Sequence, residues 1–296
     1  MNHRAASLTV FGTSVVGGSG YLVAQAILNE VGPLTLSAIR FILAGSVLLL
    51  LCRVVKADLS SAVFRLALWP GLVLALAMSC GIIGLKGSLS TIAAFLVCSD
   101  AFLIPLVDRL LFGRRTTREV SIGLLIGGSG IALLTLKPSF KISISDCWLL
   151  ASAVFWAAYT STVAHAVGRQ AALPVSCASH LIAGLLVGVF ALSFEQMPSA
   201  LSTQAVFALL YFALVISALR FTLMAKAQQS LTPSEMGLMF LAEPVAAALF
   251  GYLVASEVLS VQQWIGASLV CVALLVPVIL SSHRDRLRKW LGLGHA

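Results

Sequence analysis

Charged side chains are scarce in this chain: Asp, Glu, Lys and Arg make up 10% of its 296 residues, whereas hydrophobic residues make up 59%. This balance excludes an ordinary soluble domain. It also excludes a disordered chain, which carries many charges and few apolar residues. Long hydrophilic segments are lacking too, so most of the chain consists of apolar runs joined by short connections. The sequence therefore predicts a protein that is surrounded largely by lipid.

Motifs for metals, nucleotides and catalysis are also lacking. The six cysteines occur singly, without the CxxC or Cys/His spacing of a metal site or a disulfide framework. No glycine-rich loop could hold the phosphates of a nucleotide, and no HExxH-like or paired-aspartate motif of an intramembrane protease occurs. We therefore expect no metal, no cofactor, no use of ATP and no enzymatic activity.

The apolar runs themselves predict helices. They are about twice as long as the strands of a membrane barrel, and they show no alternation of period two. A helix of about 20 apolar residues crosses the roughly 30 Å of hydrocarbon in a bilayer. The expected fold class is an all-α polytopic membrane protein with ten transmembrane helices. They are predicted at residues 8–28, 33–51, 66–85, 88–111, 120–136, 147–167, 173–194, 205–225, 231–254 and 262–281.

Lys and Arg in the connections predict the orientation, because these residues gather on the cytoplasmic side. One side holds only Lys86, Lys137 and Lys141. The other side is predicted to hold Arg4, Arg53, Lys56, Arg65, Arg109, Arg114, Arg115, Arg118, Arg169, Arg220, Lys226, Arg284, Arg286, Arg288 and Lys289. Both termini are therefore expected in the cytoplasm, with the protein in the inner (cell) membrane. The asymmetry explains the net charge of +8 without a nucleic-acid partner, and the basic tail, residues 282–296, is expected to lie against anionic lipid.

The chain divides near Pro138 into two expected repeats, residues 8–138 and 139–281, each with five spans. An odd number of spans places the two repeats in opposite orientations across the membrane. A shift of 143 residues superimposes Asp100 on Glu243, and the same shift relates the Ile-Gly pairs of spans 5 and 10. Inverted repeats hold their substrate near the middle of the bilayer, where the repeats meet. At ~1.5 Å per residue, both acids lie near that depth.

Four ionisable residues within the apolar runs are candidates for a substrate or ion site: Arg40, Asp100, His180 and Glu243. A charge near the middle of a bilayer costs roughly 3 kcal/mol or more, so such residues usually face a polar pathway. Each residue also has a structural alternative. Arg40 could tie helices together by pairing with Asp100 or with free carbonyls. Glu243 could accept hydrogen bonds around the kink at Pro244, and His180 could be a hydrogen-bonded core histidine.

Aromatic residues at Tyr21, Trp156, Tyr159 and Tyr211 could line a cavity and contact an organic solute. Most aromatic residues in membrane proteins serve packing or interfacial anchoring. Of the four, we select Trp156 and Tyr159 as site candidates, because they lie one helical turn apart in the sixth span.

Several segments together form a recognisable pattern: Ala38–Phe41, Ser90–Val97, Ile104–Leu106, Ile122–Leu134, Leu231–Pro233, Leu241–Gly251, Ser256–Glu257 and Ile265–Gly266. These segments resemble the EamA repeats of the drug/metabolite transporter superfamily. The resemblance spans both repeats. It implies a ten-helix carrier with cytoplasmic termini and a central cavity that is lined mainly by spans 1 to 4 and 6 to 9. Two positions depart from the family pattern: Gln25 stands where the family often has Lys, and Arg114 where the first repeat often has Glu.

These observations leave three hypotheses. The first is a secondary carrier, an exporter, of an amino acid or related zwitterion, working by alternating access and with protons as a candidate coupling ion. The second is a carrier of cationic or aromatic metabolites, in which Arg40 is only structural. The third is a structural membrane protein, which would tolerate amide replacement of Asp100 and Glu243. The expected partners are a small-molecule substrate and the lipid bilayer, and the protein is a monomer or a homodimer.

Overall fold

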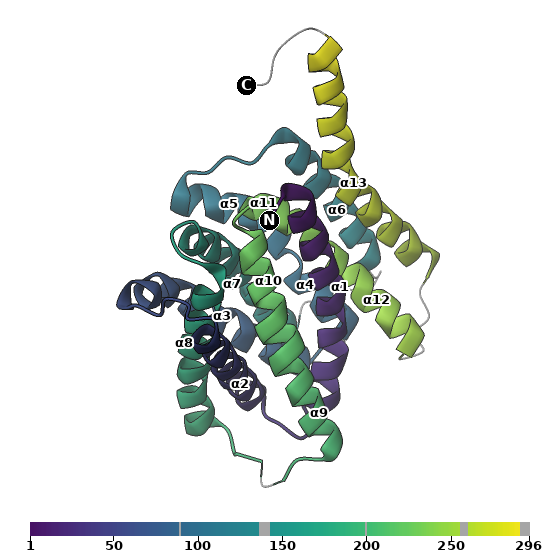
Figure 1. The fold of residues 1–296 in the computed structure, drawn as a ribbon. Coiled ribbons are helices and arrows are strands. Elements are labelled where there is room, and N and C mark those ends of the chain that lie inside the picture. The colour runs from purple at the N-terminus through teal and green to yellow at the C-terminus, as the bar shows by residue number, and fades with distance from the viewer. Residues whose placement is uncertain (89, 136–142, 199, 255–259, 291–296) are drawn as a thin grey trace.

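A computed structural model describes residues 1–88, 90–135, 143–198, 200–254 and 260–290, and over these ranges the chain is helical without any β-strand (Figure 1). In chain order the elements are α1 (His3–Ile27), α2 (Pro33–Val54), α3 (Ser61–Lys86), α4 (Ser90–Val97), α5 (Asp100–Phe112), α6 (Arg118–Thr135), α7 (Ile144–Val167), α8 (Ala172–Phe194), α9 (Thr203–Tyr211), the π-helix η1 (Phe212–Leu219), α10 (Arg220–Ala227), α11 (Pro233–Phe240), α12 (Ala242–Val254) and α13 (Val261–Trp290).

Helices lie at the positions of all the predicted spans, which confirms an all-α polytopic membrane protein. Within the described ranges, seven helical segments are long and apolar enough to cross a bilayer, and Val261–Val276 of α13 is a shorter apolar segment. The seven are His3–Ile27, Pro33–Val54, Ser61–Lys86, Ile144–Val167, Ala172–Phe194, Thr203–Ala227 and Pro233–Val254. The number of ten crossings stays a prediction.

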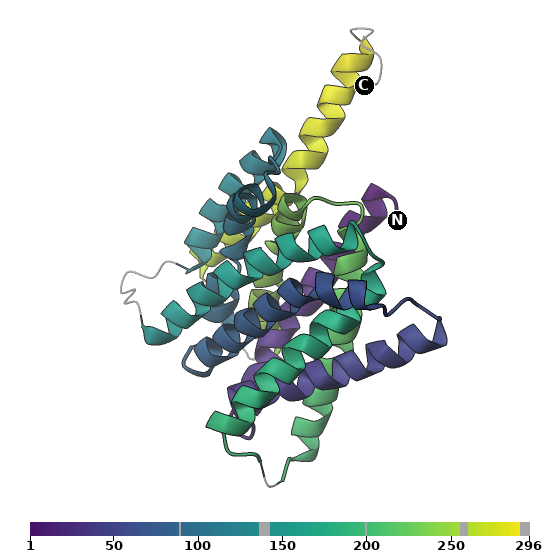
Figure 2. The ribbon, with the colours of Figure 1, turned by 90° about the vertical axis from the view of Figure 1, so that its left-hand side faces the viewer.

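Helices from the two halves of the sequence are interleaved in one bundle. The most extensive contacts join α3 to α7, α6 to α13, α2 to α8, α3 to α8 and α1 to α12. Figures 1 and 2 show α6 and α13 side by side at one flank of the bundle. Because every one of these pairs joins an early helix to a late one, the halves cannot form separate domains. The middle of the bundle is consequently shared between them.

Glycines allow these helix pairs to approach closely. A Cβ at Gly184 would lie 2.9 Å from the backbone nitrogen of Ile42, and a Cβ at Gly123 would lie 3.0 Å from the carbonyl oxygen of Ala273. Real Cβ atoms do not tolerate the first distance, and the second is tight. Small residues at such contacts let membrane helices pack through van der Waals interactions. These two glycines are therefore packing residues.

Two of the predicted spans are broken rather than continuous. The fourth span is interrupted between α4 and α5, where the Ser99 hydroxyl donates a 2.6 Å hydrogen bond to the carbonyl of Leu96 and so competes with regular helix geometry. The ninth span is interrupted at Leu241, between α11 and α12. Pro244 accounts for this second break, because it has no N–H for the carbonyl of Phe240. Asp100 and Glu243 therefore both lie just after a break.

Candidate functional site

Two adjoining cavities lie in the middle of the bundle, with about 40 and 60 Å³ of room for water. Each has room for no more than a few water molecules. The cavities share Tyr21, Val97, Trp156, Arg220 and Glu243 along their walls. These five residues come from α1, α4, α7, α10 and α12, so elements of both halves meet here. The shared wall joins the two cavities into one candidate site.

Asp100 lines the first cavity, as expected for a site residue. It is the first residue of α5, its exposed fraction is 5%, and its Oδ1 atom has no hydrogen-bond partner among the described residues. Leaving a buried charged oxygen without a partner is costly. A buried carboxylate that faces a cavity without a partner is therefore positioned to receive a ligand's donor.

Arg40 lines the second cavity and does not pair with Asp100, so the pairing alternative is wrong. Its Nε atom donates a 3.0 Å hydrogen bond to Ser217 Oγ, and its guanidinium lies 4.8 Å from the ring centre of Phe41 and 4.7 Å from that of Phe212. Its exposed fraction is 1%, and Nη1 has no partner among the described residues. Two rings and a hydroxyl hold this cation between α2 and η1.

Replacing Arg40 by Gln is expected to lower the free energy of unfolding by about 1–3 kcal/mol, since it removes a buried hydrogen bond and two cation–π contacts. Arg114→Gln is a matched control. Arg114 is 38% exposed in its pair with Asp108, and exposed pairs contribute under about 1 kcal/mol. In thermal melts of the two purified variants in detergent, Arg40→Gln should have the lower melting temperature. Equal melting temperatures would show that the rings do not hold Arg40.

Glu243 pairs with Arg220, whose Nη2 atom donates to Glu243 Oε2. The Nε atom of Arg220 also donates a 2.9 Å hydrogen bond to the carbonyl of Thr13 in α1. The assignment of Arg220 to a connection is wrong, because it is buried inside the bundle with an exposed fraction of 8%. Glu243 therefore forms an ion pair across helices, and not the local hydrogen bonds around the Pro244 kink that the alternative expects.

The sequence contained a signal for Arg220 that a count of basic residues misses. The residue lies within the predicted span 205–225, and the cost of burying charge applies to it as much as to Arg40. The eight residues before it form η1, whose π-helical turns are rare and frequently occur at functional sites. A π-helix rotates the residues that follow it relative to a regular α-helix, so a regular helical projection of this span misplaces Arg220.

The remaining candidate site residues, Trp156, Tyr159 and His180, differ in whether they line a cavity. Trp156 lines both cavities, whereas Tyr159 and His180 line neither. Tyr159 packs its ring against Trp156 and Phe221, at centroid distances of 5.5 and 5.7 Å. His180 is fully buried, and its Nδ1–H donates a 2.7 Å hydrogen bond to the carbonyl of Ser176. This arrangement agrees with the core-histidine alternative.

Comparison with known proteins identifies the family. Residues 143–279 match the model of the EamA-like transporter family. The chain therefore carries an EamA-like domain over these residues. It is accordingly a membrane transporter of the drug/metabolite transporter type, as the motifs predicted.

A solved crystal structure shares the fold of this EamA protein at a TM-score of 0.78 and covers 95% of this chain and 99% of its own chain. The two sequences are 18% identical, so the likeness concerns the fold alone. The curated proteins gave no match.

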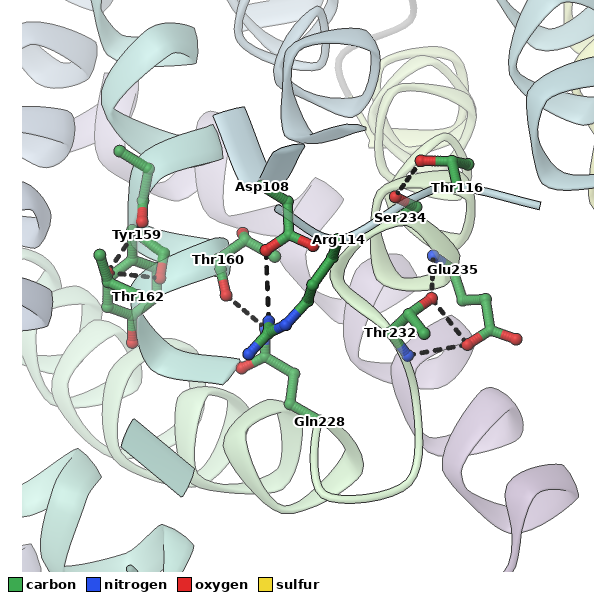
Figure 3. A network of polar contacts seen from close by, with 11 residues as sticks. Asp108, Arg114, Thr116, Tyr159, Thr160, Thr162, Gln228, Thr232, Ser234 and Glu235 are labelled. Atoms are coloured by element: carbon green, nitrogen blue, oxygen red, sulfur yellow. Dashed lines mark hydrogen bonds and ion pairs between the residues drawn. The ribbon is translucent and has the colours of Figure 1, made fainter. Parts of the chain in front are cut away.

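A network of polar contacts joins several helices of the bundle (Figure 3), and the contact between His3 and Glu235 places the N-terminus at the same end. Asp108 of α5 accepts a 3.2 Å hydrogen bond from Arg114, and Gln228 donates a 2.9 Å hydrogen bond to the carbonyl of Thr160. Asp108 lies about two helical turns, ~12 Å, beyond Asp100 on α5. The contacts therefore connect helix ends just beyond the cavity.

The same end includes the start of α11. Thr232 and Glu235 form a capping box, in which Glu235 accepts a hydrogen bond from the backbone N–H of Thr232. Glu235 also accepts a 2.9 Å hydrogen bond from His3, and the hydroxyls of Thr116 and Ser234 lie 2.8 Å apart. These contacts tie α1, α11 and the connection after α5 together.

Different contacts link the helices at the opposite end. Gln25 of α1 donates a 3.1 Å hydrogen bond to the carbonyl of Ser88, just after α3. Glu195, at the end of α8, accepts hydrogen bonds from the backbone N–H and hydroxyl of Thr35, both at 2.8 Å. Glu30 accepts hydrogen bonds from the backbone and hydroxyl of Ser202, and these bonds lower the pKa of Glu30. Both ends of the bundle are therefore linked by contacts between early and late parts of the chain.

Proposed function

We propose that this EamA protein is a secondary transporter, working as an exporter, of an amino acid or a related zwitterion. The solute binds in the central cavity, and alternating access exposes that cavity to one side of the membrane at a time. The termini lie in the cytoplasm and the protein in the inner membrane. Asp100 or Glu243 exchanges a proton during the cycle.

One observation carries the proposal. A buried carboxylate oxygen of Asp100, which has no partner in the described part of the chain, lines the same cavity as the Arg220–Glu243 ion pair. In their ionised forms, these three residues and Arg40 sum to zero charge. A zwitterion adds no net charge to such a cavity, whereas a simple anion or cation leaves one uncompensated charge in a low dielectric. The site thus suits a solute that brings both signs.

The arrangement of the helices supports two inverted five-helix repeats, residues 8–138 and 139–281. A two-fold relation between such repeats pairs α2 with α8 and α6 with α13, and both pairs are in extensive contact. The shift of 143 residues also superimposes Cys98, at the break of the fourth span, on Leu241, at the break of the ninth. Broken helices at the interface of inverted repeats typically surround the substrate of a secondary transporter.

Purified protein in liposomes tests the proposal. Each of the twenty amino acids is tested in turn: liposomes are preloaded with the unlabelled amino acid, and uptake of the same radiolabelled amino acid is measured. For at least one of them, uptake should be faster than into protein-free liposomes. The uptake should depend on a pH gradient for at least one of them. If no amino acid moves under any gradient, the proposal is wrong.

A second candidate is a carrier of cationic or aromatic metabolites. The observation in its favour is that Ser217 and two rings already hold Arg40, while Glu243 neutralises Arg220, so that Asp100 is left as the unpaired charge. Under this alternative, primary amines should compete for uptake as well as the corresponding amino acids do. Weak competition by amines favours the zwitterion.

A further inference from the structure

Arg220 differs from the other buried arginine of the site in its surroundings. Arg40 is enclosed between rings, whereas Arg220 lies where the two cavities meet and lines both of them. A Cβ on Gly17 of α1 would collide with the guanidinium of Arg220 and the carboxyl of Glu243. The glycine therefore creates the space in which this ion pair lies.

Arg220 makes two kinds of hydrogen bond: one anchors its side chain, and the other can be exchanged for a ligand. Its Nε atom is anchored by the main-chain carbonyl of Thr13, which keeps the guanidinium in place whichever anion it binds. Its Nη2 atom donates to Glu243. A guanidinium has five N–H donors in a fixed fork that matches a carboxylate. The group that occupies this fork in the structure is itself a carboxylate, so it shows the ligand chemistry that the fork accepts.

We propose that Arg220 binds the carboxylate of the substrate, and that Glu243 occupies the guanidinium when the site is empty. This inference rests on the proposed function. Asp100 lines the same cavity and offers its unpartnered oxygen to the substrate's ammonium group. Tyr21 and Trp156 contact the remainder of the solute. The Arg220–Glu243 pair is then a contact that the substrate replaces, and its exchange links substrate binding to α1, α10 and α12.

The test compares each of the twenty amino acids with its carboxamide, which keeps the ammonium group and lacks the carboxylate. Ligand-induced shifts in melting temperature are measured on the detergent-purified full chain, since a ligand stabilises the state that binds it. Wild-type protein should be stabilised by at least one amino acid, and its carboxamide should bind at least about tenfold more weakly.

Three variants decide the role of Arg220. The double variant Arg220→Gln/Glu243→Gln removes both charges together, so that neither is left buried alone, and it should bind acid and amide equally. Glu243→Gln alone leaves Arg220 without its resident partner and should bind the amino acid more tightly than wild type does. Arg114→Gln, at an arginine that lines neither cavity, serves as the control and should keep the wild-type preference for the acid.

The outcomes separate the two proposals. If the double variant keeps the preference for the acid, or if wild type binds acid and amide equally while transport is retained, Arg220 does not bind the carboxylate and only this inference is overturned. If no amino acid stabilises or is transported by the wild-type protein, the proposed function is overturned as well.

Discussion

Replacing Asp100 by Asn is expected to abolish transport and, at the same time, to make the protein more stable. Truncating one partner of a buried charged contact costs about 2–5 kcal/mol of binding, which corresponds to at least about a 30-fold loss of affinity. The stability change has the opposite sign. Asp100 Oδ1 has no partner in the structure, and an unsatisfied buried group costs about 1–3 kcal/mol. A neutral amide of the same shape is still without a partner, but it costs less to bury than a charged carboxylate does.

Asp108→Asn is the matched control, because Asp108 is a second buried aspartate on the same helix and is paired with Arg114. The amide should weaken that pair and lower the melting temperature, while amino-acid binding is retained. Melting curves and uptake into liposomes measure both effects. A less stable Asp100→Asn protein that still transports its solute would show that Asp100 supports the fold and does not bind substrate.

The opposite signs of these two effects have a general reason. Residues at functional sites are retained for what they bind, and their unmet hydrogen bonds cost stability until a ligand arrives. Asp100, at a helix break and beside a cavity, has this property, whereas Asp108, about two turns away, has its own partner. The comparison therefore separates a binding residue from a structural one on a single helix.

The sequence was sufficient for the fold class because lipid imposes one strong constraint. Every spanning segment must be apolar and must satisfy its own backbone, so long apolar runs predict helices directly. The depth of a residue also follows from its number along the run. This places Asp100 and Glu243 near the middle of the bilayer, and both residues line the first cavity.

The direction in which a side chain points could not be obtained in the same way, because it depends on the phase of each helix. Trp156 and Tyr159 are three residues apart on α7, yet only Trp156 lines the cavities. The π-helix before Arg220 and the break before Asp100 both alter that phase. The partners of an ion pair are still harder to predict from the sequence. That Glu243 pairs with Arg220, and that Arg40 does not pair with Asp100, depends on which helices are neighbours.

Gly18→Ala is expected to have the largest effect on stability of any single-methyl change on α1. The added Cβ would lie 2.7 Å from the backbone nitrogen of Ala247 and 2.8 Å from the carbonyl oxygen of Glu243. Both atoms belong to the backbone of α12, so no side chain can rotate out of the way. The two helices must separate, and overpacking of this kind costs about 1–3 kcal/mol or more.

The same change at Gly12 is the control, since a Cβ there meets nothing within 4 Å. It should leave the melting temperature unchanged or raise it, because Ala favours the helix by about 0.8–1.0 kcal/mol over Gly. Gly18→Ala should also weaken the Arg220–Glu243 ion pair, since the displaced backbone carries Glu243 away from Arg220. If both alanine variants melt at the wild-type temperature, α1 and α12 are not in the close contact that holds this ion pair.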